Sequence, residues 1–219
     1  MKPILRKNQL ILALDVTDSE NAIRIIKETA QYVDAVKIGY PLVLGSGLDI
    51  IDTISEYAPV IADFKVADIP NTDRLICIQA FEAGAGAVIV HGFTGMDSVS
   101  ECVKTANKYH GEIYVVTEMS HPGAVEFMQP KTLELASLAV VCKASGVVAP
   151  ATRPERVSYI RDIVGDLTII SPGVGAQGGS AADAIKAGAD YIIVGRSIYE
   201  SKNPGIEAEK IVREIENCR

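Results

Sequence analysis

The fold and a candidate site are both indicated by one stretch of the chain, Val60-Ile61-Ala62-Asp63-Phe64-Lys65-Val66-Ala67-Asp68-Ile69-Pro70-Asn71-Thr72. Its apolar start predicts a buried strand. Residues two apart on a strand point to the same face, so Asp63 and Lys65 are expected to project together, with Asp68 just beyond the strand end. Charges buried so close together are costly unless they are paired. The stretch therefore predicts a reaction in which carboxylates and an ammonium group act at close quarters.

Length and composition bound the class of protein. The chain has 219 residues, of which 48% are hydrophobic, which predicts one compact domain spanning residues 1–219. The net charge of −7 argues against nucleic-acid binding, although it allows a locally basic pocket for a small anion. The N-terminus lacks the long apolar region of a signal peptide, and no stretch is long and apolar enough to span a membrane.

The four cysteines show no C-x-x-C spacing; they are Cys77, Cys102, Cys142 and Cys218. This pattern predicts reduced, partly buried thiols in a cytoplasmic protein, and neither a zinc site nor a disulfide framework.

Short apolar runs alternate with longer amphipathic ones along the whole chain. In Ser19–Tyr32, for example, the apolar residues recur at the three- and four-residue spacing of a helix. The expected strands are Leu10–Leu14, Ala35–Ile38, Val60–Phe64, Ala87–His91, Ile113–Thr117, Gly146–Ala149, Leu167–Ser171 and Tyr191–Val194. The expected helices are Ser19–Tyr32, Gly47–Tyr57, Thr72–Ala83, Asp97–Lys108, Lys131–Lys143, Pro154–Ile163, Ser180–Ala187 and Pro204–Asn217.

Eight strand–helix units predict an α/β fold, a closed parallel (β/α)₈ TIM barrel. The alternative is an open doubly wound sheet, which usually has fewer strands and a Gly-x-Gly-x-x-Gly turn after the first strand. Here the first strand ends in Leu14-Asp15-Val16-Thr17, without glycine. A barrel places its chemistry at the carboxyl ends of its strands. Functional residue types recur there: Asp15, Lys37, Asp63, Lys65, His91, Ser120, Pro172-Gly173 and Gly195-Arg196.

The charged cluster comprises Lys37, Asp63, Lys65 and Asp68. Alternating charges hold each ion against opposite neighbours, which keeps the lysines protonated and the carboxylates ionised near neutral pH. A buried salt-bridge network that merely closes the barrel would use the same residues.

Two glycine-rich segments follow the last two expected beta strands, Ser171–Ser180 and Val194–Ser197. Glycines let backbone N–H groups approach an anion, and the loops after strands seven and eight form the usual phosphate site of such barrels. Arg196 would add a charge-assisted contact. The alternative is a pair of ordinary glycine-rich turns.

The remaining polar signals are weaker. Thr117–Gly123 could be a polar lid, a pocket wall or an ordinary loop. His91 could be a general base, but it fits a hydrogen-bonded core histidine better, and His110 and His121 fit loop or surface positions. No His, Asp or Glu spacing indicates a metal site.

With these residues considered, the sequence resembles orotidine 5′-phosphate decarboxylases in their compact archaeal form. The family signature Asp-x-Lys-x-x-Asp-Ile-Pro-x-Thr is met from Asp63 to Thr72. Further matching segments are Leu14-Asp15, Val36-Lys37, Glu118–Gly123, Pro172–Gly179 and Gly195–Tyr199, so the resemblance covers nearly the whole chain.

The resemblance implies removal of carbon dioxide from orotidine 5′-phosphate to give UMP, in pyrimidine biosynthesis, without metal or organic cofactor. Lys65 would protonate carbon 6 of the pyrimidine. Asp63 would lie beside the departing carboxylate and hold Lys65, and Lys37 would bridge the ribose and Asp63.

The resemblance also implies the binding residues. Asp15 would bind a ribose hydroxyl, Ser120 would read the pyrimidine edge, and Pro172 would pack at the site. The phosphate would be held by Gln177, Arg196 and the backbone of Gly195. The partner subunit of a homodimer would supply Asp68, Ile69 and Thr72.

Two other functions would use some of the same residues. A magnesium-dependent sugar-phosphate decarboxylase or aldolase would share Asp-x-Lys-x-x-Asp, but the Ile-Pro-Asn-Thr that follows Asp68 favours the nucleotide enzyme. A non-catalytic phosphoribosyl-nucleotide binding protein would keep the phosphate loops without needing the whole charged cluster.

Overall fold

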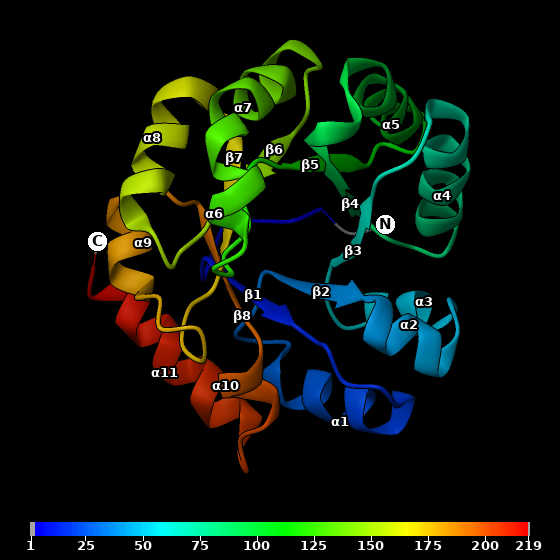
Figure 1. The fold of residues 1–219 in the computed structure, drawn as a ribbon. Helices are drawn as coiled ribbons and strands as arrows, with labels where there is room; N and C mark the ends of the chain where they lie inside the picture. The colour runs from blue at the N-terminus through cyan, green and yellow to red at the C-terminus, as the bar shows by residue number, and fades with distance from the viewer. Residues whose placement is uncertain (1–2, 219) are drawn as a thin grey trace.

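The computed structural model describes residues 3–218; Met1, Lys2 and Arg219, at the ends of the predicted domain, lie outside the described residues. Eight parallel strands pair in chain order and β1 also pairs with β8, so the sheet closes into a barrel with helices around it (Figure 1). The predicted TIM barrel is therefore confirmed, and the open sheet is excluded. The strands are β1 Leu10–Ala13, β2 Ala35–Gly39, β3 Val60–Val66, β4 Ala87–His91, β5 Glu112–Val116, β6 Gly146–Val148, β7 Thr168–Pro172 and β8 Tyr191–Val194.

Some helices begin at a residue whose side chain caps the first turn. In α1, for example, Asp18 caps the helix by accepting a 2.8 Å hydrogen bond from the backbone N–H of Asn21, and Ile25 and Ile26 are fully buried. The α-helices are α1 Ser19–Thr29, α2 Tyr40–Ser46, α3 Ile50–Ser55, α4 Pro70–Glu82, α5 Met96–Lys108, α6 Ala124–Phe127, α7 Thr132–Val141, α8 Pro154–Val164, α9 Ala181–Lys186, α10 Arg196–Tyr199 and α11 Pro204–Glu216. Two short 3-10 helices, η1 Gly92–Thr94 and η2 Gln129–Lys131, complete the set.

The helix expected over Gly47–Tyr57 is present in a shorter form as α3, and α2 precedes this range as a helix that was not predicted. The chain turns at Gly47, whose φ of +84° lies in the left-handed region that ends helices. Gly45 lies inside α2, where an added Cβ would come within 2.0 Å of the Thr17 carbonyl oxygen. Close packing, rather than a turn, therefore accounts for this glycine.

The buried residues form two layers that follow the alternation of each strand. In β1, Leu10 and Leu12 pack outward against the helices, whereas Ile11 and Ala13 point into the barrel. The barrel interior is filled by Ile11, Ala13, Ala35, Ile61, Ala87, Ile89, Tyr114, Val116, Val148, Ile170, Tyr191 and Ile193. Because Asp63 lies two residues beyond Ile61, the inward face of β3 changes from apolar to charged at the carboxyl end of the barrel.

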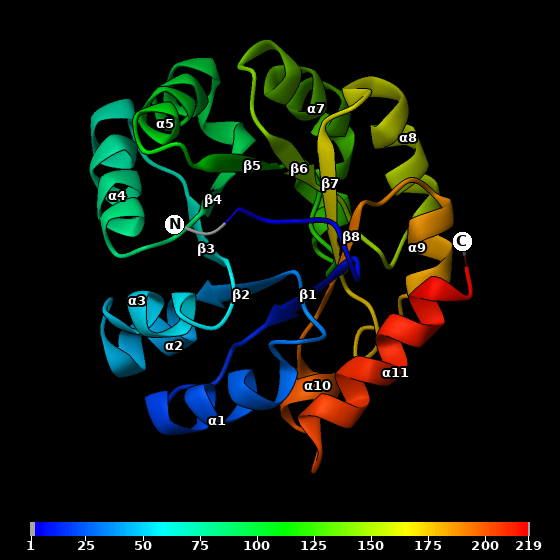
Figure 2. The same cartoon turned by 180° about the vertical axis from the view of Figure 1, so that it is seen from behind.

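The amino end of the barrel is covered by the N-terminal segment, which crosses it in Figure 2. Ile4 packs against the interior cluster, and the Asp34 carboxylate accepts hydrogen bonds from the backbone N–H groups of Lys7, Asn8 and Gln9 at 2.7–3.0 Å. A functional pocket at this end would have to displace that segment.

Two further observations bear on the sequence-based expectations. Within residues 3–218, no helix is both long and apolar enough to cross a bilayer. The cysteines are free thiols, with Cys77, Cys102 and Cys142 buried and Cys218 partly exposed.

Candidate active site

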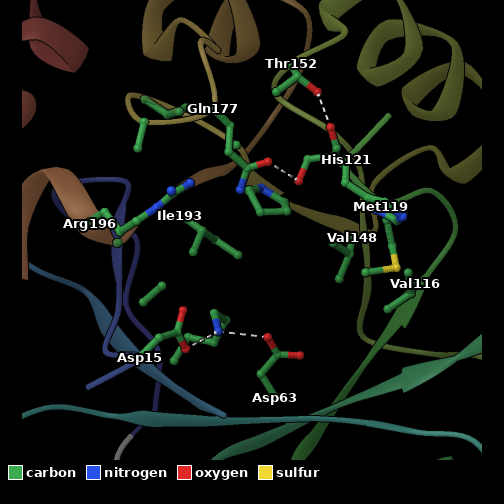
Figure 3. Close-up of a pocket in the computed structure, with 18 of the residues that line it drawn as sticks. Asp15, Asp63, Val116, Met119, His121, Val148, Thr152, Gln177, Ile193 and Arg196 are labelled. Carbon is green, nitrogen blue, oxygen red and sulfur yellow. Dashed lines mark hydrogen bonds and ion pairs between the residues drawn. The ribbon is translucent and has the colours of Figure 1, made fainter. Parts of the chain in front are cut away.

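A cavity of about 780 Å³ opens at the carboxyl ends of the strands. This volume lies within the range of small-molecule sites. Figure 3 shows its two ends, with Asp15 and Asp63 on one side and Gln177 and Arg196 on the other. Nine of the residues predicted from the sequence line it: Asp15, Lys37, Asp63, Lys65, Ser120, Pro172, Gln177, Gly195 and Arg196.

Four of these residues form a continuous ion chain, Asp15–Lys37–Asp63–Lys65. The Lys37 Nζ lies 3.3 Å from Asp15 Oδ1 and 2.8 Å from Asp63 Oδ2. The Lys65 Nζ lies 2.7 Å from Asp63 Oδ1 and 2.8 Å from Asp63 Oδ2. Asp63 thus accepts from both ammonium groups, and each charge in the ion chain has an opposite neighbour.

In the ion chain, burial and ion pairing shift the pKa values of Asp63 and Lys37 in opposite directions. Burial alone would raise the pKa of Asp63, but Lys37 and Lys65 outweigh it and hold that pKa below its ordinary value. Burial alone would lower the pKa of Lys37, but Asp63 and Asp15 outweigh it and raise that pKa. Both groups are therefore charged at neutral pH. Lys65 is the more accessible lysine, with 35% of its side chain exposed against 9% for Lys37.

The backbone at Lys65 departs from a regular strand. Its φ is +43°, a left-handed conformation that is uncommon for a residue with a side chain, and the pairing of β3 with β4 shifts register between Ala62 and Val66. A bulge of this kind redirects a side chain at the end of a strand. Here the redirected side chain is the lysine that meets Asp63 over the cavity, and backbone strain commonly gathers at functional positions.

The other side of the cavity is built by the loop after β7 and the start of α10. Gly173 and Gly175 have φ values of +108° and +75°, which glycine adopts without strain. The Ser120 hydroxyl donates a 2.8 Å hydrogen bond to Gln177 Oε1, which ties this loop to the segment after β5. Arg196 begins α10, and its side chain extends toward Gln177 in Figure 3.

Asp68, Ile69 and Thr72 do not line the cavity of their own chain. Asp68 and Ile69 are exposed on the connection between β3 and α4, and Thr72 is half-buried in the first turn of α4. The Asp68 carboxylate accepts a 2.7 Å hydrogen bond from the backbone N–H of Ile69. The structure therefore brings together Lys37, Asp63 and Lys65 of the charged cluster and leaves Asp68 outside.

His91 ends β4, where its ring packs against Phe93 with centroids 4.7 Å apart. Its Nδ1 is buried without a hydrogen-bond partner, so the hydrogen-bonded core histidine expected from the sequence is wrong in that detail. Burial and then the charge of Lys65 lower the pKa of His91 to about 4, which keeps the ring neutral at pH 7. His110 and His121 are exposed, as expected, and His121 also lines the cavity.

Thr117–Gly123 includes a wall of the cavity, since Met119, Ser120, His121 and Pro122 line it. A network that the sequence did not reveal anchors this wall. Glu118 is fully buried and is paired with Arg153 Nε at 3.0 Å and Arg156 Nε at 2.9 Å.

Tyr199, Thr152 and Arg153 also line the cavity without having been assigned a role from the sequence. The signal that the sequence offered was the pair of arginines, Arg153 and Arg156, at the start of an expected helix. Within residues 3–218, no group of three or more His, Cys, Asp or Glu side chains is arranged to hold a metal ion.

Comparison with known proteins places these features in a family. Residues 8–211 match the model of the orotidine 5′-phosphate decarboxylase / HUMPS family. The chain is 66% identical to the orotidine 5′-phosphate decarboxylase of Methanococcoides burtonii, covering 97% of this chain and 99% of the relative. It is 54% identical to that of Thermococcus kodakarensis, covering 96% and 98%. The crystal structure of orotidine 5′-monophosphate decarboxylase from Methanocaldococcus jannaschii, complexed with the inhibitor BMP, matches with a TM-score of 0.91 and 47% identity, covering 94% and 97%.

Proposed function

Because the chain belongs to the orotidine 5′-phosphate decarboxylase / HUMPS family, we propose that it removes carbon dioxide from orotidine 5′-phosphate to give UMP, and that it does so without a metal ion or organic cofactor. Decarboxylase activity in pyrimidine biosynthesis is supported by the near full-length likeness to the curated enzymes.

One observation carries the proposal: the ion chain Asp15–Lys37–Asp63–Lys65 lines the same cavity as Gln177 and Arg196. A ligand with a phosphate at one end and a reacting carboxylate at the other would need a cation at each end. Arg196 supplies the first and Lys65 the second. Binding energy gained at the phosphate can then offset the repulsion between the reacting carboxylate and Asp63.

Lys65 would protonate carbon 6. Loss of carbon dioxide leaves a carbanion whose electron pair lies in the plane of the pyrimidine ring, outside its π system. An ammonium group has three N–H donors, and contacts of Lys65 with the two Asp63 oxygens can use two of them. The third can point at carbon 6, where it would stabilise the developing negative charge and then transfer its proton.

Asp63 would hold Lys65 in place and lie beside the departing carboxylate. Its lowered pKa supports this role because the carboxylate stays ionised, and it helps to raise the pKa of Lys37. Lys37 would link Asp63 to the ribose, and Asp15 would bind a ribose hydroxyl.

The rest of the cavity would bind the nucleotide. Arg196, Gln177 and the backbone of Gly195 would hold the phosphate, where a guanidinium can donate two parallel hydrogen bonds. Ser120 would read the pyrimidine edge, and Pro172 would pack at the site.

We propose further that the site is completed in a homodimer by Asp68, Ile69 and Thr72 of the partner subunit. The support is the exposure of Asp68 together with large apolar side chains on the segments that follow the neighbouring strands β2, β3 and β4. Their exposed fractions are 49% for Tyr40, 81% for Leu44, 64% for Ile69, 63% for Phe93 and 54% for Met96. Exposed apolar surface of this kind marks interaction sites. A cytoplasmic location fits the free thiols and is proposed with it.

The test follows carbon dioxide release and the ultraviolet change of orotidine 5′-phosphate with protein that has been treated with a chelator. We expect full activity after chelation. A magnesium-dependent enzyme would lose its activity and regain it with added metal, and a nucleotide-binding protein would bind UMP without turnover. Either result would reject the proposal.

A further inference from the structure

The backbone of Asp68 is fixed by two buried side chains that lie outside the cavity. The Asp68 N–H donates a 2.9 Å hydrogen bond to Asp73 Oδ1, and the Asp68 carbonyl accepts a 2.8 Å hydrogen bond from the Ser98 hydroxyl. Asp73 is 1% exposed and Ser98 is 2% exposed. The backbone N–H and the backbone carbonyl of the exposed residue Asp68 are thus both hydrogen-bonded to buried side chains.

The two side chains come from different helices. Asp73 lies in the first turns of α4 and Ser98 in the first turn of α5, and these helices pack against each other. The connection from β3 to α4 is tied again where the backbone N–H of Asp73 donates to the Ile69 carbonyl at 3.0 Å. The direction in which the Asp68 side chain leaves the surface is therefore set by α4 and α5 together.

The position is electrostatically unfavourable for a carboxylate. Burial, followed by the nearby carboxylates of Asp68 and Asp97, raises the pKa of Asp73, while the hydrogen bond from the Asp68 backbone opposes the shift. No ion pair joins Asp73 to a cation in the part of the chain that the structure describes. At this position, Asp73 acts as the hydrogen-bond acceptor for the backbone N–H of Asp68.

We propose that Asp73 and Ser98 are positioning residues for the decarboxylation, which hold the Asp68 peptide so that its carboxylate enters the site of the partner subunit in the required direction. This rests on the proposed function, in which Asp68 completes that site. The Ile69 N–H occupies only Oδ1 of the Asp68 carboxylate, so Oδ2 can reach a ligand while the two bonds to the peptide persist.

A helix-capping role would use the same contacts, so the test must separate positioning from stability. A double-mutant cycle does this with Asp68→Ala, Asp73→Ala and their combination, measured by decarboxylation in the full-length protein. Asp73→Ala removes the acceptor and should lower kcat/KM about 10- to 100-fold. In the Asp68→Ala background it should change kcat/KM by less than about twofold, because there is no carboxylate left to position.

A conservative variant and a matched control separate positioning from stability in the double-mutant cycle. Asp73→Asn keeps an acceptor oxygen and should restore kcat/KM to within about threefold of the wild type. Ser98→Ala removes one of the two bonds, and it provides the same cycle if Asp73→Ala does not fold. Thr105→Val is the control on α5: it removes a buried hydroxyl that donates to the Glu101 carbonyl at 2.8 Å, far along the helix from Asp68, and should leave kcat/KM unchanged.

Amide hydrogen exchange gives a second readout that needs no activity. The Asp68 amide should exchange at least about tenfold faster in Asp73→Ala than in Asp73→Asn or Thr105→Val. An equal fall in kcat/KM on Asp73→Ala in the wild-type and Asp68→Ala backgrounds would overturn the positioning role alone. Unchanged exchange of the Asp68 amide in Asp73→Ala would do the same. Absence of turnover in the wild type would instead refute the proposed function, and full activity of Asp68→Ala would refute the shared site and the positioning role with it.

Discussion

The Lys65 ammonium nitrogen lies 2.7 and 2.8 Å from the two carboxylate oxygens of Asp63, although Lys65 has a backbone φ of +43° and is not in a regular strand conformation. The sequence spacing predicted that the two side chains would meet, since residues two apart on a strand share a face. The pairing of β3 with β4 shifts register around this position, between Ala62 and Val66. The contact between Lys65 and Asp63 therefore depends on the local backbone conformation as well as on the attraction between the two charges.

Asp63→Asn should destabilise the protein. The change leaves the Lys37 and Lys65 ammonium groups without the carboxylate they share, and the Lys37 side chain is only 9% exposed. Breaking a buried ion pair costs about 3 kcal/mol. Urea unfolding at pH 7 measures the loss of free energy of unfolding, and Glu134→Gln, which breaks a pair of exposed side chains with Lys131, is the control. Equal stability of Asp63→Asn and the wild type would show that the ion chain is not held as described.

Arg196→Ala should weaken the binding of phosphorylated ligands selectively. A charge-assisted hydrogen bond contributes about 1.5–3 kcal/mol, so UMP affinity should fall about 10- to 100-fold while uridine affinity changes little. Calorimetry with both ligands measures the difference. The control is Arg213→Ala, which removes an arginine of α11 that is paired with Glu209 on the surface. Unchanged UMP affinity in Arg196→Ala would count against the phosphate role.

A shared site makes a prediction about mixtures of two variants with strongly reduced activity. Lys65→Ala and Asp68→Ala dimers each lack a group in both sites, whereas a mixed dimer has one intact site because the two losses fall in the other. After subunit exchange, activity should return to about one quarter of the wild-type value, since about half of the dimers are mixed and each has one of its two sites intact. Sedimentation shows whether dimers form. Activity carried by a monomer would overturn the shared site.

His91 should make stability depend on pH in the acid range. Its pKa is about 4 in the folded protein, against an ordinary value of 6.5, so between these values the unfolded chain binds a proton that the folded protein does not. Stability contributed by the neutral ring is therefore lost as the pH falls from 6.5 to 4. Allowing for partial exposure of the ring, the wild type should lose roughly 1 to 2 kcal/mol more than His91→Gln between pH 7 and pH 5. Urea unfolding at fixed protein concentration measures both, and parallel pH profiles would contradict the assignment.

Most of the barrel could be predicted from the sequence because its strands are short apolar runs between turn residues. Ala87–His91 and Tyr191–Val194 have the predicted bounds, and the remaining strands shift by one or two residues at their ends. Helix α2 was missed because Pro41, Gly45 and Gly47 together resemble a turn. Their roles depend on tertiary packing, since Gly45 allows close approach of the Thr17 backbone and Pro41 lies in the first turn of α2, where proline is tolerated.

The candidate site, like the barrel, could be predicted from the sequence only in part. Asp63, Lys37 and Arg196 could be placed because each was expected within two residues of the carboxyl end of a strand, and the carboxyl ends of parallel strands meet at one edge. The left-handed backbone of Lys65 and the pairing of Glu118 with Arg153 and Arg156 could not be predicted, because they depend on a register shift and on contacts between residues about 35 positions apart.

Lys65→Ala tests the central claim most directly. The measurement is single-turnover conversion of orotidine 5′-phosphate by the purified variant, followed by carbon dioxide release, with UMP affinity and circular dichroism recorded on the same sample. Loss of the proton donor should lower the rate at least about 10³-fold while UMP affinity stays within about threefold and the fold is retained. A folded variant that binds UMP and turns over at a rate near the wild type would contradict Lys65 as the acid.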